Sequence, residues 1–193
     1  FEVDWRPPRT ASAQGAVAEV HQLLRQGYTD VVDADLSKYF DTIPHTDLLK
    51  SVARRASDGA VLHLLRMWLK APVEEEDEAG RKRRTGGKGH PMGTPQGGVI
   101  SPLLANIYMS RFLRAWRERG MGDALKAKVV NYADDLVILC RGTAVQALGV
   151  ARRWIGGMKL TLNERKTRLC DARKEAFNFL GYTFGPMVHR PTG

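Results

Sequence analysis

Apolar residues along the chain recur either every three or four positions or every second position. Helical spacing predicts helices over 11–26, from Pro44 to about 56, and over 61–69, 99–116 and 145–158. Runs rich in β-branched and aromatic residues predict strands over 28–36, 129–140 and 177–184, the last two as hairpins, with a short extended stretch at 160–163. This order predicts an α+β fold with an antiparallel sheet packed on helices.

The stretch between the third and fourth predicted helices is polar. Residues 74–84 run acidic, pass Ala79-Gly80 and then run basic, which favours an exposed hairpin whose arms attract each other, with a solvated loop tip as the alternative. The many Gly and Pro residues of 86–98 predict an irregular loop that leads into the helix at 99–116.

Charge and cysteine usage limit the classes of function. Thirty Lys and Arg against 21 Asp and Glu give a net charge of +9, which makes nucleic acid the first partner to consider. The two cysteines lack the spacing of a zinc site or a disulfide framework, so an intracellular, cytoplasmic setting is expected. No apolar run reaches the roughly 18–20 residues of a membrane span. The chain begins with Phe1 and its last residues lack a closing element, so we expect a piece of a longer protein.

Asp134 and Asp135 interrupt an apolar segment. Two interpretations compete: an ordinary Asp-Asp turn at the tip of a surface hairpin, or a charged site between strands apolar enough to be central in a sheet. Burying an unpaired carboxylate is costly, so the second interpretation requires a cation nearby.

A second acidic pair ends the strand predicted at 28–36. The period of two places Asp33 and Asp35 on one face, so alternation does not choose between them. Carboxylates on adjacent strand ends could hold Mg²⁺, and two such ions about 3.5–4 Å apart can clamp the attacking and leaving oxygens of a phosphoryl transfer.

Five segments in order carry a resemblance to a known family. They are VVDADLSKYFDTIPH, GTPQGGVISPLLANIYM, YADDLVIL, LTLNERKT and FNFLGYTF. Together they resemble the reverse transcriptases of the group II intron type, the intron-encoded maturases and their bacterial relatives. The resemblance implies a polymerase palm with part of the fingers: residues 1–30 as a partial fingers or palm helical segment, and 31–193 as the palm with the acidic site. The upstream fingers and the thumb would lie outside the chain.

The resemblance also assigns a metal site. Asp35 and Asp134 would bind two Mg²⁺ ions, for which Mn²⁺ could substitute, the Leu36 carbonyl would add a ligand, and Asp135 would complete the acidic set.

Other residues would contact the nucleotide. Tyr39 matches the aromatic steric gate against a ribose 2′-hydroxyl, and Gln96 and Gly97 match the loop that touches the nucleotide or template. Lys166 aligns with a basic residue proposed to protonate the pyrophosphate leaving group. The alternatives are a core aromatic at 39, an ordinary turn at 96–97 and a surface lysine at 166.

The hairpin at 177–184 resembles the primer grip, with Phe179, Leu180 and Gly181 at its centre. Here Phe177, Phe179 and Tyr182 could equally be core residues.

The resemblance therefore predicts an RNA-directed DNA polymerase that extends a DNA primer with dNTPs on an RNA template. The alternative is a maturase-type protein that binds structured intron RNA with little polymerase activity. An RNA-dependent RNA polymerase is disfavoured by Tyr39, because a ribonucleotide user should carry a smaller or polar residue there.

Overall fold

The computed structural model describes residues 12–76, 82–87, 89–95 and 98–186. The chain divides into two compact units. Residues 1–37 and 113–193 form the sheet unit, and residues 38–112 form the helical unit. The α+β class is confirmed, with an antiparallel sheet and helices. The predicted division into 1–30 and 31–193 stays a prediction.

Four antiparallel strands form the centre of the sheet unit. They are β1 (Asp30–Ala34), β4 (Ala127–Tyr132), β5 (Asp135–Cys140) and β6 (Arg168–Asp171), in the order β4-β5-β1-β6. Every residue of β5 after the first is buried, as the continuous apolar run predicts for a central strand. The expectation that both arms of the 129–140 hairpin are central is wrong for β4, which lies at an edge of the described sheet.

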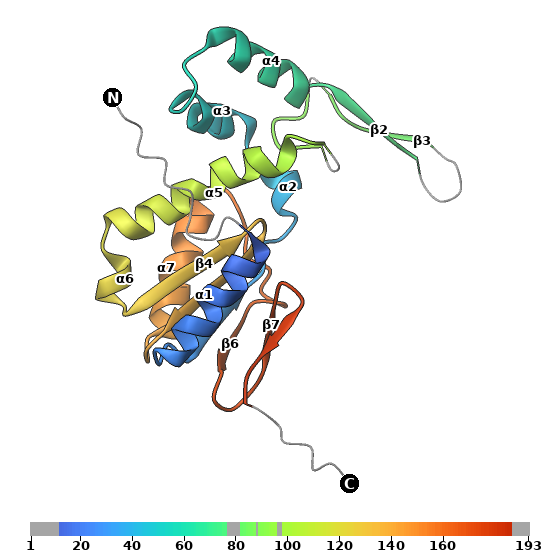
Figure 1. Cartoon of the computed structure of the whole chain (residues 1–193). Coiled ribbons are helices and arrows are strands. Elements are labelled where there is room, and N and C mark those ends of the chain that lie inside the picture. The colour runs from blue at the N-terminus through green and yellow to red at the C-terminus, as the bar shows by residue number, and fades with distance from the viewer. Residues whose placement is uncertain (1–11, 77–81, 88, 96–97, 187–193) are drawn as a thin grey trace. The chain divides into compact units, whose positions relative to one another are not determined.

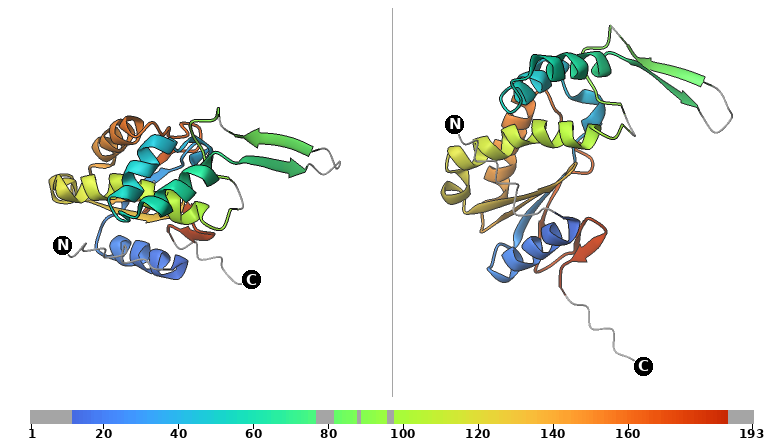
Figure 2. Two further views of the ribbon diagram at one scale, coloured as in Figure 1. Left: turned by 90° about the horizontal axis from the view of Figure 1, so that it is seen from above. Right: turned by 45° about the horizontal axis from the view of Figure 1, so that its top comes forward.

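Both faces of this sheet are covered (Figure 1). Helix α1 (Ala13–Arg25) and the hairpin of β7 (Phe177–Phe179) and β8 (Tyr182–Phe184) pack on one face, and α7 (Ala144–Gly157) contacts β1 and β5 from the other, as the views of Figure 2 also show. Alternation in β1 divides its side chains between the two layers, and both Val31 and Val32 are fully buried.

The core on the α1 side is a single cluster. Its members are Ala16, Val20, Leu23, Val31, Val130, Val137, Leu139, Cys170, Ala172, Phe177, Phe179 and Phe184. Because directly paired residues of antiparallel strands point to the same side, Val31, Asp33 and the residues of this cluster share one face.

The helical unit contains α2 (Tyr39–Thr42), α3 (His45–Ala53), α4 (Gly59–Leu69), β2 (Pro72–Glu76) and β3 (Lys82–Gly86). Helix α5 (Ser101–Glu118) starts in this unit and ends in the sheet unit, where the short α6 (Met121–Ala124) follows. The predicted hairpin is confirmed, since the acidic positions 74–76 pair with the basic positions 82–84, while its expected turn at Ala79-Gly80 lies outside the described residues. Within the described ranges, no helix is long and apolar enough to cross a membrane.

Candidate active site

The exit of β1 and the start of β5 bring four aspartates to one end of the sheet. Strand pairing runs from Asp33 with Val137 to Ala34 with Leu136, and one further step of this register places Asp35 beside Asp135. Asp33, Asp35 and Asp135 therefore lie on the same face, and Asp134 immediately precedes β5. We call Asp33, Asp35, Asp134 and Asp135 the acidic cluster.

The turn between β4 and β5 holds Ala133 and Asp134, flanked by the directly paired Tyr132 and Asp135. The backbone of Ala133 has a φ of 54°, in the left-handed region. Both aspartates are exposed, so the expectation of carboxylates buried between apolar arms is wrong. Burial starts only at Leu136.

Charge crowding takes the place of burial as the distinguishing property of this site. The pKa of Asp135 is raised, first because nearby protein atoms reduce its hydration and then because Asp134, Asp33 and Asp35 repel its negative charge. The three neighbouring carboxylates therefore oppose the ionisation of Asp135.

The segment after α7 is bonded directly to the strand that carries Asp35. The Asn163 backbone N–H donates to the Asp35 carbonyl at 2.8 Å, and the Asp35 N–H donates to the Thr167 hydroxyl at 3.3 Å. Leu36, the predicted carbonyl ligand, is buried and forms an isolated bridge with Leu162. The motifs VVDADLS and LTLNERKT thus form one structural element although they are far apart in sequence.

Two cations from this segment contact the acidic cluster. Lys166 Nζ lies 3.6 Å from an Asp35 carboxylate oxygen, and Arg168 Nε donates to Asp33 at 3.1 Å. Lys166 was predicted from the sequence, whereas Arg168 and the strand β6 that begins with it were not. The one sequence signal for this four-residue strand is that Arg168 and Cys170 share one face while the exposed Leu169 between them lies on the other.

The donor set of the cluster suits a hard divalent cation, because Mg²⁺ prefers carboxylate oxygens. Among the described residues, no three acidic, His or Cys side chains are grouped closely enough to ligate one ion. Asp33 and Asp35 are instead paired with Arg168 and Lys166. The residues fit magnesium in type and in accumulated charge, and binding would require Asp35 to exchange its contact with Lys166 for the ion.

The remaining residues that were predicted to contact the nucleotide fall within the range 38–112 of the helical unit. The Tyr39 side chain is buried, and its hydroxyl donates to the Ala105 carbonyl at 2.6 Å. Gln96 and Gly97 lie outside the described residues. A Cβ on the neighbouring Gly98 would meet Ser101 Oγ at 2.8 Å and the Trp68 ring at 2.9 Å, so local packing excludes a larger residue there.

The hairpin expected to grip the primer has a buried strand and an exposed turn. Phe177 and Phe179 are buried in the core cluster, as the alternative interpretation predicted for them, whereas Tyr182 is 54% exposed. Leu180 and Gly181 form the turn with φ values of 52° and 79°. Any contact with a primer would therefore come from this turn rather than from the Phe179 ring.

Comparison with known proteins gives a consistent result. The family model described as "Reverse transcriptase (RNA-dependent DNA polymerase)" matches residues 4–184. Protein YkfC of Escherichia coli is 33% identical to this chain, over 79% of the chain and 46% of YkfC. The putative COX1/OXI3 intron 1 protein of Saccharomyces cerevisiae is 27% identical, over 95% of this chain and 27% of the yeast protein. The group II intron-encoded protein LtrA of Lactococcus lactis is 35% identical over 40% of this chain and 12% of its own length.

Among solved structures, the truncated apo telomerase of Candida tropicalis superposes with a TM-score of 0.66 at 14% identity, covering 90% of this chain and 38% of that one. At this identity the likeness concerns the fold. The chain spans about half of YkfC and about a quarter of the yeast intron protein. The expected resemblance to intron-type reverse transcriptases is confirmed by the family match and by these relatives.

Proposed function

Because the chain belongs to the reverse transcriptase (RNA-dependent DNA polymerase) family, we propose that its acidic cluster is the catalytic site of an RNA-directed DNA polymerase palm. One observation carries the proposal: Asp35, Asp134 and Asp135, which come from distant segments, lie together at one end of the sheet. A buried structural pair would be neutralised by its neighbours, whereas this group retains a surplus of negative charge.

In this proposal Asp35 and Asp134 hold two Mg²⁺ ions, with the Leu36 carbonyl as a further ligand and Asp135 at the periphery, and Mn²⁺ can substitute. The bound ions would activate a primer 3′-hydroxyl and neutralise the triphosphate. Lys166, whose Nζ lies 3.6 Å from Asp35, would donate a proton to the departing pyrophosphate. The protein itself would contribute positioning and electrostatic stabilisation.

The substrates follow from the same assignment: an RNA template, a DNA primer and a dNTP. The net charge of +9 favours a polyanionic partner. Tyr39, Gln96 and Gly97 would contact the incoming nucleotide, and Phe179, Leu180 and Gly181 would lie near the primer end. These contacts stay predictions.

The alternative function is binding of intron RNA without polymerisation. It is favoured by the names of the matched relatives, which include a group II intron-encoded protein and a yeast intron protein. Pure RNA binding gives no reason for four neighbouring carboxylates, since these repel phosphates.

The test is Mg²⁺-dependent extension of a labelled DNA primer on an RNA template by the protein at its natural length. We expect extension by the wild type and its loss in Asp134→Ala, while Asp171→Asn, which removes an acid at the other end of the sheet, retains it. Tight RNA binding without extension by the wild type would favour the intron-RNA function instead.

A further inference from the structure

The side-chain amide of Asn131 braces the turn that carries the acidic pair. Its Nδ2 donates to the Ala133 carbonyl at 3.1 Å and to the Asp135 carbonyl at 3.0 Å. Both partners are acceptors, so only the NH₂ end of the amide can face them, and the side-chain orientation is fixed. One partly buried side chain thus holds the backbone on both sides of Asp134.

Asn131 does this from the side of the sheet away from the carboxylates. It pairs directly with Leu136, whereas the next pair, Tyr132 with Asp135, points to the opposite face. Asn131 therefore points away from the face on which the acidic cluster would hold a metal ion. Any influence on the site passes through the position of the Asp134 and Asp135 backbone.

The turn needs such a brace because it contains no glycine. Ala133 adopts a φ of 54°, a conformation that costs a residue with a Cβ about 1–2 kcal/mol. The turn between β7 and β8 also uses left-handed residues, but there Gly181 takes one of the two positions. Without the hydrogen bonds from Asn131, the acidic turn would relax toward conformations that direct Asp134 and Asp135 elsewhere.

We propose that Asn131 is a positioning residue that holds the Ala133-Asp134 turn so that Asp134 and Asp135 can bind divalent metal together with Asp35. The inference rests on the proposed function, since it assigns a role in metal binding at the same site. It extends that function to a residue on the far face of the sheet that touches neither metal nor substrate.

Asn131→Asp separates this role from a simple charge effect. The aspartate has nearly the same shape but cannot donate to the two carbonyls, and it adds a negative charge near the site. If only charge mattered, the variant would bind cations more tightly. If the brace matters, we expect binding to weaken about tenfold, as is typical when the partner that orients a metal ligand is lost.

The measurement is Mn²⁺ binding by electron paramagnetic resonance on the wild type, Asn131→Asp, Asn131→Ala, Asp134→Asn and the control Gln146→Glu, with Tm recorded for each. Gln146 is exposed on α7, so the control adds the same charge outside the site. We expect weaker binding in both Asn131 variants and no change in the control. Adding Ala133→Gly to Asn131→Ala should restore most of the affinity, because glycine adopts the turn without strain.

The outcomes distinguish the two proposals. Wild-type or tighter affinity in Asn131→Asp and Asn131→Ala, with weakened binding in Asp134→Asn, would overturn the role of Asn131 and leave the metal site intact. Equal binding by the wild type and Asp134→Asn would overturn the metal site itself. A loss in Asn131→Ala that Ala133→Gly does not reverse would also contradict the brace, because its purpose is to hold that strained residue.

Discussion

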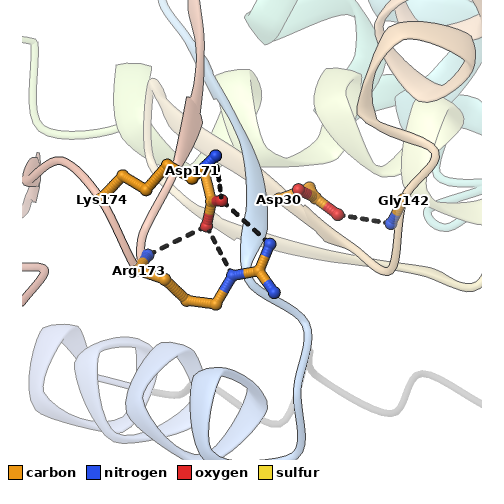
Figure 3. Close-up of polar contacts among 5 residues, drawn as sticks. All are labelled: Asp30, Gly142, Asp171, Arg173 and Lys174. Carbon is orange, nitrogen blue, oxygen red and sulfur yellow. Dashed lines mark hydrogen bonds and ion pairs between the residues drawn. The ribbon is translucent and has the colours of Figure 1, made fainter.

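Strand β1 carries acidic residues at both ends, and the two ends differ in how their charge is compensated. At the entry, Asp30 pairs directly with Asp171 of β6, an arrangement of like charges that costs stability unless each is satisfied. Figure 3 shows the groups that satisfy the two carboxylates. Asp171 accepts hydrogen bonds from the Arg173 backbone N–H at 3.0 Å and from the Arg173 guanidinium at 2.8 and 2.9 Å, and Lys174 Nζ lies 3.8 Å away. Asp30 accepts a hydrogen bond from the Gly142 N–H. The pKa of Asp171 falls to about 2, mainly through the Arg173 side chain.

At the exit, compensation is incomplete. Asp33 and Asp35 each contact one cation, but neither carboxylate of Asp134 or Asp135 accepts a hydrogen bond or forms an ion pair within the part of the chain that the structure describes. The pKa of Asp135 moves up instead of down. The acidic pair at the entry is thus satisfied by groups of neighbouring loops, whereas the exit keeps negative charge available for a ligand.

The largest contrast should come from the two lysines. Lys166 lies 3.6 Å from Asp35 and Lys174 3.8 Å from Asp171, so the substitutions Lys166→Gln and Lys174→Gln remove equivalent ion pairs at opposite ends. In primer extension with saturating dNTP, we expect Lys166→Gln to lower the turnover about 100-fold, the range of a general acid, and Lys174→Gln to leave it unchanged. Equal rates in both variants would remove Lys166 from the chemistry.

The two arginines should give a smaller difference. Arg168 holds Asp33 at 3.1 Å and Arg173 holds Asp171 at 2.8 Å. Arg168→Gln leaves the acidic cluster more negative, so Mn²⁺ should bind about two- to fivefold more tightly, in keeping with the small energy of an exposed ion pair. Arg173→Gln is the matched control, for which titration should show the wild-type affinity. A weaker site in Arg168→Gln would mean that the arginine positions Asp33 rather than offsetting its charge.

The smallest expected difference is in the free energy of unfolding at pH 7, which substitutions at the two ends of β1 should change in opposite directions. The pKa of Asp135 is raised, so its contribution to stability is present below its unfolded pKa and is lost as the pH rises through the higher folded pKa. Asp135→Asn should therefore stabilise the metal-free protein at pH 7, by about 0.2–1 kcal/mol for relief of like charges, and have little effect at low pH.

Asp171→Asn should do the reverse. The pKa of Asp171 is lowered to about 2, so its stabilisation is present above its unfolded pKa and is lost as the pH falls toward that value. The variant should have a lower Tm than the wild type at pH 7, with the gap closing in acid. Thermal melts of Asp135→Asn and Asp171→Asn at pH 7 and pH 3 test these two predictions. A Tm shift of the same sign in both variants at pH 7 would contradict the difference between the two ends of β1.

The sequence was sufficient where a feature depends on local periodicity. The helices of 13–25 and 144–157 and the strands around Val32 and Leu139 follow directly from the spacing of apolar residues. The grouping of Asp33, Asp35 and the acidic turn followed from strand alternation together with the family resemblance, which also pointed to Lys166.

Features set by tertiary pairing were not visible. Four residues are too few for the period of β6 to be distinguished, so Arg168 was not recognised as a partner of Asp33. The edge position of β4 depends on which strand pairs with which, and both arms of the hairpin are apolar. Exposure of Asp134 depends on how far the hairpin extends beyond its covering layers. Asn131 reads as an ordinary polar residue until the turn geometry is known.

The placement of β1 between β5 and β6 also has a consequence for how the chain folds. The bonds that complete the site join residues 132 and 135 positions apart, Asp35 with Thr167 and Asp33 with Arg168. During synthesis β1 leaves the ribosome long before β5 and β6, and both of its edges stay unpaired until those strands are made. Such long-range pairing is slow and leaves nascent chains prone to aggregation. The acidic end of the sheet would thus be among the last parts to assemble, and a chain that stops before residue 168 would lack the contact of Arg168 with Asp33.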